Sequence, residues 1–216
     1  MQSINPHLLN VLVVLLYILL FGGLSLVRQE GLSTRFALES LALGGLVVGA
    51  SLAAGTPASP VLVLVALYLV TMRCRWLAEL GTLLGRRGQF GVAQSLYGLA
   101  LRLWPDTVGR RIALLNRGAM WLKAGNPQAA REVLEPLLRE EGLSPKHAAA
   151  AHYNLGIAYE RLGQGERAVG HFNAAMEALP GSLYALGAEA ALRRRRKAAA
   201  APPEGPEGEG EEGGEG

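Results

Sequence analysis

Hydrophobic residues fill the first third of the chain almost without interruption. Residues 8–27 form a run of twenty without a charge, long enough at about 1.5 Å per residue to cross a hydrocarbon core about 30 Å thick. A second apolar stretch, 36–72, is broken only by Glu39 and the turn-forming segment 55–60, which favours a hairpin of two shorter spans. The pattern predicts a membrane domain over residues 1–72, with spans at about 8–27, 36–55 and 56–72.

Two alternatives bear on this membrane domain. The third span is marginal in length, so a re-entrant hairpin formed by the last two segments is one alternative. A cleaved signal peptide is the other alternative, but no Lys or Arg precedes the first apolar run, and the run is longer than such peptides usually carry. We therefore expect the first segment to be retained as a helix.

Positive charges predict the orientation of the spans. Arg28 and Arg35 lie between the first two spans and Arg73 and Arg75 follow the third, whereas the N-terminus and the turn at 55–59 have none. Because Lys and Arg gather on the cytoplasmic side, the chain is expected to be a multi-pass protein of the cell (inner) membrane. Its N-terminus would lie outside and everything after residue 73 in the cytoplasm.

A few residues in or beside the spans are candidates for a functional role. Glu39, about one turn inside the second span, is expected to be an interfacial, solvated carboxylate rather than a functional one. The glycines at 22–23, 44–45 and 49 would let helices approach closely, although glycine is common in membrane helices. The lone Cys74 allows no internal disulfide and is interpreted as structural.

Beyond the spans, three stretches share one skeleton of small, aromatic and proline residues. The clearest copy is Leu155-Gly156, Tyr159, Gly163, Ala168, Phe172, Ala175 and Pro180. The others are Leu80-Gly81, Leu84, Gly88, Phe90, Ala93, Tyr97, Ala100 and Pro105, and more weakly Gly118, Trp121, Gly125, Ala130 and Leu134. This skeleton resembles the tetratricopeptide repeat, a pair of antiparallel helices that stacks on copies of itself. The resemblance implies a three-repeat helical solenoid over 73–182 and protein binding without chemistry. Together with the apolar spans, it predicts an all-α fold in which N-terminal transmembrane helices precede the solenoid.

The spacing of these residues also predicts how the helices pack and where the chain turns. Glycines at 81, 118 and 156, each followed twelve residues later by alanine, predict close helix contacts, and Tyr97, Leu134 and Phe172 would fill the space between neighbouring repeats. Glycines at 88, 125 and 163 would take positive φ at the turn inside each pair. The predicted helices are 73–87, 90–104, 109–124, 127–140, 145–162 and 166–179, and Pro136 should kink the fourth. A capping helix is expected over 183–197, and the third span should run unbroken into the first repeat.

The resemblance also implies which residues line the concave face of the stack. These are Arg86, Leu115, Ala119, Leu122, Lys123, Tyr153, Ile157, Glu160 and Arg161. One column, formed by Arg86, Lys123 and Arg161, is basic in all three repeats and would hold an acidic peptide. The alternative is that these cations are solvated helix ends, which are ordinary at this position. The Lys and Asn set of the chaperone-binding carboxylate clamp is not supplied, so chaperone tails are not expected as ligands.

The last residues of the chain are strongly charged. Arg193, Arg194, Arg195, Arg196 and Lys197 form a basic block that would contact anionic lipid, pair with the tail, or simply be solvated. Residues 198–216 read as a disordered acidic tail, since 201–216 hold six Glu and no Lys or Arg. One hypothesis is that this tail folds back and competes for the basic column.

No enzyme signature accompanies these features. The four His and single Cys form no catalytic or metal-binding motif, so we expect no catalytic, metal or cofactor-binding residues, no cofactor and no nucleic-acid partner. The sequence predicts a membrane-anchored adaptor or scaffold that presents its groove on the cytoplasmic face. The alternative is an assembly or transport component whose transmembrane helices are functional and whose repeats are regulatory. The preference for Arg over Lys, 18 to 3, suggests a bacterial origin.

Overall fold

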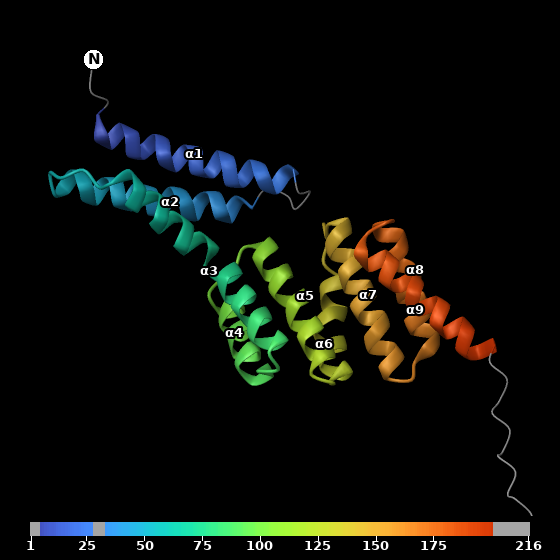
Figure 1. Ribbon diagram of the computed structural model, residues 1–216. Helices are drawn as coiled ribbons and strands as arrows, with labels where there is room; N and C mark the ends of the chain where they lie inside the picture. Colours follow the sequence, from blue (N-terminus) through green and yellow to red (C-terminus); the bar gives the residue numbers. More distant parts are fainter. Residues whose placement is uncertain (1–4, 28–32, 201–216) are drawn as a thin grey trace, which may run out of the picture.

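The computed structural model describes residues 5–27 and 33–200, which are helical throughout apart from their connectors (Figure 1). The helices of this part of the chain are α1 (Pro6–Val27), α2 (Thr34–Ala53), α3 (Pro60–Arg86), α4 (Phe90–Arg102), α5 (Thr107–Lys123), α6 (Pro127–Leu138), α7 (Pro145–Arg161), α8 (Gly165–Ala178) and α9 (Leu183–Ala200). The all-α prediction is confirmed. Arg28 and residues 201–216 of the acidic tail, with the hypothesis that the tail competes for the groove, lie outside the described residues.

The first three helices pack on one another as an apolar bundle. Helices α1, α2 and α3 contact each other in all three pairings, and polar side chains tie them together internally. Tyr17 and Thr71 share a hydroxyl hydrogen bond of 2.6 Å, and the Asn10 amide donates to the Ala58 carbonyl at 2.9 Å. Among the glycines expected to allow close approach, Gly44 does so, because an added Cβ would lie 2.6 Å from Val14. Added Cβ atoms at Gly23, Gly45 and Gly49 would meet nothing.

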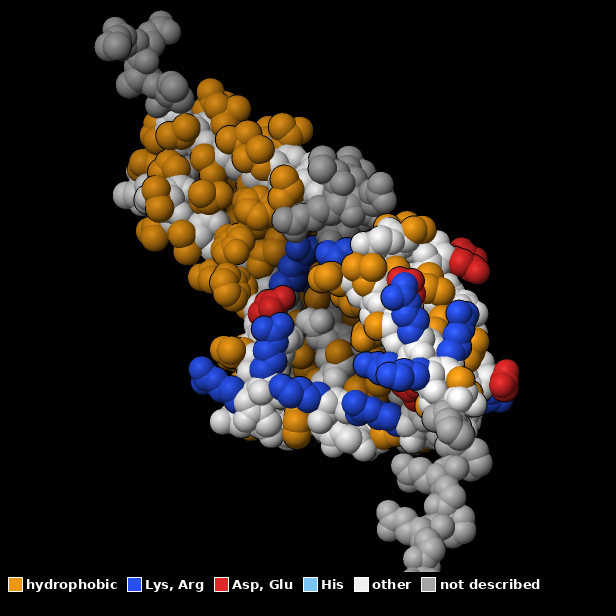
Figure 2. All heavy atoms as spheres, turned by 45° about the vertical axis from the view of Figure 1, so that its right-hand side comes forward, with side chains coloured by type: hydrophobic (Ala, Val, Ile, Leu, Met, Phe, Trp, Pro, Cys, Tyr) orange, Lys and Arg blue, Asp and Glu red, His pale blue; other side chains and the backbone are white. Residues whose placement is uncertain are grey.

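Exposed apolar side chains cover the outer surface of this bundle. Leu19 of α1 is 71% exposed, Leu46 of α2 69% and Leu62 of α3 68%, and Figure 2 shows hydrophobic side chains covering this part of the molecule. Soluble proteins rarely expose so large a contiguous apolar area. By length and composition, α1, α2 and α3 are able to cross a membrane.

Helix α3 joins the apolar bundle to the rest of the chain without a break. It runs for 27 residues from Pro60 to Arg86, so the predicted continuity between the third apolar segment and the first repeat is confirmed. It begins four residues later than the predicted span because the preceding segment forms a turn. The Ser51 hydroxyl holds that turn by accepting from the Ala58 amide at 2.8 Å and donating to the Thr56 carbonyl at 2.9 Å.

The remaining helices form three antiparallel pairs, α3–α4, α5–α6 and α7–α8, followed by α9. Apart from the start of α3, the ends of α3 to α8 fall within two residues of the predicted ones. Helix α9 begins at Leu183 as predicted but runs to Ala200, three residues beyond the predicted end at 197, so residues 198–200 are helical and the prediction that the disordered tail begins at 198 is wrong for them. Polar N-caps explain why several begin where they do: Asp106, Asn126 and Ser144 each accept a hydrogen bond from the backbone three residues on. The turn glycines at 88, 125 and 163 have φ values of +81°, +77° and +73°, as predicted from their position.

Small residues face large ones across each pair. A Cβ added at Gly156 would lie 2.5 Å from the Phe172 ring, and one added at Gly118 would lie 2.6 Å from Leu134. The predicted close contact is therefore present. However, these large side chains pack over the glycine of their own repeat as well as in the core between repeats.

The repeats are arranged in two layers. Neighbouring helices of one layer, α3, α5, α7 and α9, contact each other, whereas in the described part of the chain α4, α6 and α8 contact only the helices before and after them. The layer with the closer helices must lie on the inside of the curve. The stack is therefore concave along α3, α5, α7 and α9.

Two irregular places in the stack are stabilised locally. Helix α6 contains Pro136 and ends at Leu138, two residues before the predicted end. The chain leaves the helix through tighter backbone bonds, from the Arg139 amide to the Pro136 carbonyl and from the Glu140 amide to the Leu137 carbonyl. The long connector that follows is held by Arg111, 7% exposed. The Arg111 guanidinium donates to the Gly142 and Glu141 carbonyls, each at 2.7 Å, and to the Glu140 carboxylate at 3.1 Å.

A polar joint connects the bundle to the first repeat. Arg73 pairs with Glu39 at 2.7 Å and donates to the Leu103 carbonyl at 2.9 Å. The Arg35 guanidinium lies 4.8 Å from the centre of the Trp104 ring, a residue with φ of +59°. Glu39 is thus an ion-pair partner at the joint rather than simply solvated. Because these contacts tie the α4–α5 connector to α2 and α3, they add to the continuity of α3 in setting the angle between bundle and stack.

Candidate functional site

The inner faces of α3, α5 and α7 form one surface of the repeats that several elements share. Each helix turns the same register of positions toward it, since positions four, seven and eleven apart lie on one face of a helix. Figure 2 shows Lys and Arg side chains around a hollow in the surface of the repeats. This surface is the candidate binding site.

The nine residues expected to line this surface fall into three groups by exposure. Arg86, Ala119, Lys123 and Arg161 are exposed, and Tyr153, Ile157 and Glu160 are half-buried. Leu115 and Leu122 are only 7% and 5% exposed. These two leucines pack in the core between successive repeats, so they stabilise the stack and offer almost no surface to a ligand.

The basic column has a structural use that the spacing did not reveal. The Lys123 ammonium donates to the Arg86 carbonyl at 2.8 Å, and the Arg161 guanidinium donates to the Leu122 carbonyl. These carbonyls belong to the last turn of the preceding inner helix, where backbone acceptors have no partner within the helix. Each cation therefore caps the helix before it, favourably for the helix dipole. The side chains remain exposed, so their charge is still presented to solvent.

The third repeat is partly covered by α9. A Cβ added at Gly187 would lie 2.8 Å from the Tyr153 ring, and the rings of Tyr153 and Tyr184 are 6.1 Å apart. The Glu160 carboxylate lies 3.7 Å from the Arg195 guanidinium. Helix α9 thus acts as a fourth inner helix. The pair Leu186-Gly187, which repeats the Leu155-Gly156 pair, was the sequence signal for this role.

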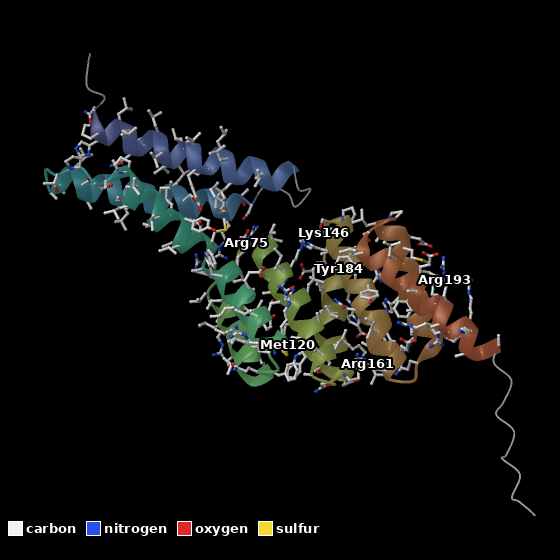
Figure 3. All side chains as sticks on the ribbon, in the orientation of Figure 1. Arg75, Met120, Lys146, Arg161, Tyr184 and Arg193 are labelled. Atoms are coloured by element: carbon white, nitrogen blue, oxygen red, sulfur yellow. The ribbon has the colours of Figure 1, made fainter. Side chains whose placement is uncertain are left out.

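The basic block on α9 lies at the far end of the stack from the apolar bundle (Figures 1 and 3). Arg193 donates to Glu189 at 2.6 Å and Arg195 is paired with Glu160. Two of the four arginines expected to contact anionic lipid are therefore engaged within the protein. This placement does not support lipid contact by Arg193, Arg194, Arg195 and Arg196.

Several titratable groups within the repeats have shifted pKa values, among them a pair of histidines and Glu140. His152 of α7 and His171 of α8 lie with their Nδ1 atoms 3.0 Å apart. Burial lowers the pKa of both, and the neighbouring His152 lowers the pKa of His171 further. Burial would raise the pKa of Glu140, but its hydrogen bonds from Arg110 and Arg111 outweigh this effect and lower it.

The histidine pair joins α7 to α8, and the His171 ring also stacks on the Tyr159 ring at 5.2 Å between ring centres. Among residues 5–27 and 33–200, no group of three or more His, Cys, Asp or Glu side chains is arranged to hold a metal ion. The concave face presents the exposed cations Arg86, Lys123 and Arg161 together with the exposed Ala119 and the half-buried Ile157.

Comparison with known proteins agrees with this architecture. The family model of the tetratricopeptide repeat matches residues 79–140 and 122–182, which is the segment from the second half of α3 to the end of α8. Searches of curated proteins and of solved structures returned no match.

Proposed function

The chain is a tetratricopeptide repeat protein, and we propose that it is a membrane-anchored scaffold whose concave face binds a protein partner on the cytoplasmic side. Tetratricopeptide repeats suggest a role in protein–protein interaction, and the family is generally a non-catalytic scaffold. The observation that carries the proposal is helix α3, which is both the third apolar helix and the first inner helix of the stack.

The exposed apolar surface of the bundle supports the anchoring. The backbone polar groups of α1, α2 and α3 are satisfied within the helices, which is the condition for a segment to cross lipid. Several internal polar side chains find partners inside the bundle, as in the bond between Tyr17 and Thr71 and in the bond from the Asn10 amide to the Ala58 carbonyl. A water-soluble bundle would leave its leucines facing water at a cost of about 25 cal/mol per Å² of apolar area.

The charges at the joint support the orientation. Arg35, Arg73 and Arg75 all lie at the end of the bundle next to the repeats, and the turn at residues 55–59 at the opposite end has no charge. Positive charges near span ends favour the cytoplasmic side. The repeats would therefore be cytoplasmic.

The charges of the concave face support an acidic partner. Arg86, Lys123 and Arg161 keep exposed side chains although two of them cap helices. Between these cations the exposed Ala119 leaves room for a ligand. An extended acidic segment lying across the inner helices would meet one cation in each repeat.

Cysteine labelling tests the anchoring and the orientation. In a Cys74→Ser background, Thr56→Cys in the turn should react with a membrane-impermeant maleimide added to intact cells. Gln128→Cys on α6, which is exposed, should react only after the membrane is permeabilised. The reverse pattern would refute the orientation, and recovery of the chain in the soluble fraction would refute the anchoring.

Site-specific photocrosslinking tests the binding face. A photoreactive amino acid at Ala119 on the concave side should capture a protein partner, and the same amino acid at Gln128 on the outer layer should not. The capture should weaken at high salt and in Lys123→Glu. Equal capture at both positions would show that the concave face is not the binding surface.

A further inference from the structure

A cavity lies where the apolar bundle meets the repeats. Its volume is about 340 Å³, and its walls come from the end of α1, the start of α2, the middle of α3 and the start of α5. The cavity is partly open to the surface, and its volume falls within the range of small-molecule sites, which are usually clefts of this kind. Figure 3 places Arg75 in this region, where α3 leaves the other apolar helices.

The lining changes from apolar to charged along α3. Phe21, Phe36 and Met72 face the cavity on the side of the bundle, and Arg75 and Glu79 face it on the side of the repeats. Met72 and Glu79 are seven residues apart, or about 10 Å at 1.5 Å per residue. The headgroup region of one leaflet is about 5–8 Å thick, so this change takes place over the depth at which lipid headgroups lie.

The charged groups in the wall are of both signs. Arg75, Glu79 and Asp106 all line the cavity, and one Asp106 oxygen accepts from the Gly109 amide at 2.9 Å. A guanidinium pairs well with a phosphate, and carboxylates pair well with an ammonium group that has N–H donors. The aromatic rings of Tyr68 and Trp76, 6.1 Å apart and both in the wall, add faces that attract a cation.

We infer that this cavity binds one phospholipid with a zwitterionic, primary-amine headgroup, of the phosphatidylethanolamine type. The phosphate lies toward Arg75, the ammonium group toward Glu79 and Asp106, and an acyl chain along Phe21, Phe36 and Met72. An anionic headgroup without an amine would bring its negative charge to two carboxylates and bind less well. The inference rests on the proposed insertion of the bundle in a membrane.

Native mass spectrometry of the full chain tests this site. The protein is reconstituted in vesicles of equal phosphatidylethanolamine and phosphatidylglycerol, released in mild detergent, and weighed with its retained lipid. We expect one phosphatidylethanolamine per chain. Retention should fall about tenfold in Arg75→Gln, the effect of losing one charge-assisted contact, and should be lost in Met72→Trp, whose side chain fills the cavity.

Two matched variants control for general effects. Arg139→Gln removes an exposed arginine from the end of α6, and Leu62→Trp adds the same bulk to α3 on its outer surface, 68% exposed; both should retain lipid as the wild type does. Preferential retention of phosphatidylglycerol, or wild-type retention in Met72→Trp, would overturn the inference. An alkaline wash of the vesicles separates the two proposals. Release of the chain refutes membrane insertion, whereas a chain that resists the wash but carries no phosphatidylethanolamine refutes the lipid site alone.

Discussion

Replacing Gly156 by alanine should destabilise the third repeat even though alanine is the better helix former. The added Cβ would lie 2.5 Å from two atoms of the Phe172 ring, and that ring is fully buried and cannot move aside. Overpacking of this kind costs about 1–3 kcal/mol, and the gain in helix propensity returns up to about 1 kcal/mol. The net loss should be about 1 kcal/mol, and up to about 2 kcal/mol.

Gly170→Ala is the matched control, because Gly170 lies inside α8 and a Cβ there would meet nothing within 4 Å. It should stabilise the protein by about 0.5–1 kcal/mol. The assay is urea unfolding of the full chain in detergent, followed by circular dichroism at 222 nm. Hydrogen exchange of the α7 and α8 amides should show faster local opening in Gly156→Ala only. A Gly156→Ala protein at least as stable as Gly170→Ala would refute the packing argument.

Three further predictions concern other parts of the chain. Arg111→Met should lower the free energy of unfolding by about 2 kcal/mol, because the variant removes the charged hydrogen bonds from the half-buried connector, to Glu140 and to the Glu141 and Gly142 carbonyls, while Glu140 keeps its bond from Arg110. Arg139→Met should change this free energy little, and equal effects of the two variants would contradict the role of Arg111. Burial lowers the pKa of His152 and His171 in the folded state, so the unfolded state takes up protons first as the pH falls. The contribution of these histidines to the free energy of unfolding should therefore be fully present above about pH 6.5 and should decrease as the pH drops below it. Urea unfolding between pH 7.5 and 5 should show this loss, and His171→Phe should reduce it; an unchanged slope would contradict the assignment. If the chain is an anchored scaffold, replacing α1 and α2 by unrelated transmembrane helices should leave the capture of the partner intact. Loss of the cellular function while the partner is still captured would instead favour transmembrane helices that are themselves functional.

Much of the fold could be read from the sequence because its signals are local. An uncharged run predicts an apolar helix, and glycine at a fixed place after a helix predicts the turn with positive φ. The six repeat helices were placed correctly for this reason. Asp106, Asn126 and Ser144 also act over three residues only, so the starts of α5, α6 and α7 carried a local signal.

The candidate site was less predictable, because exposure depends on what the rest of the chain does. Leu115 and Leu122 stand at positions that line the groove by spacing, yet the neighbouring repeats bury them. Side chains and backbone of α9 cover Tyr153 and Glu160. The sequence of α9 is equally consistent with a solvated capping helix. A pattern that repeats every 37 or 38 residues cannot tell which face of a helix the following helix will occupy.

The sequence by itself determined the helices, their turns and the order of an apolar segment followed by a repeat stack, since periodicity, glycine and proline act on neighbouring residues. Tertiary structure alone decided how these parts meet. Glu39 and Arg73, far apart in the chain, become an ion pair at the joint, the cations of the basic column become caps of the helix before them, and four separate elements enclose one cavity. Such contacts arise from packing between distant segments, and no local pattern specifies them.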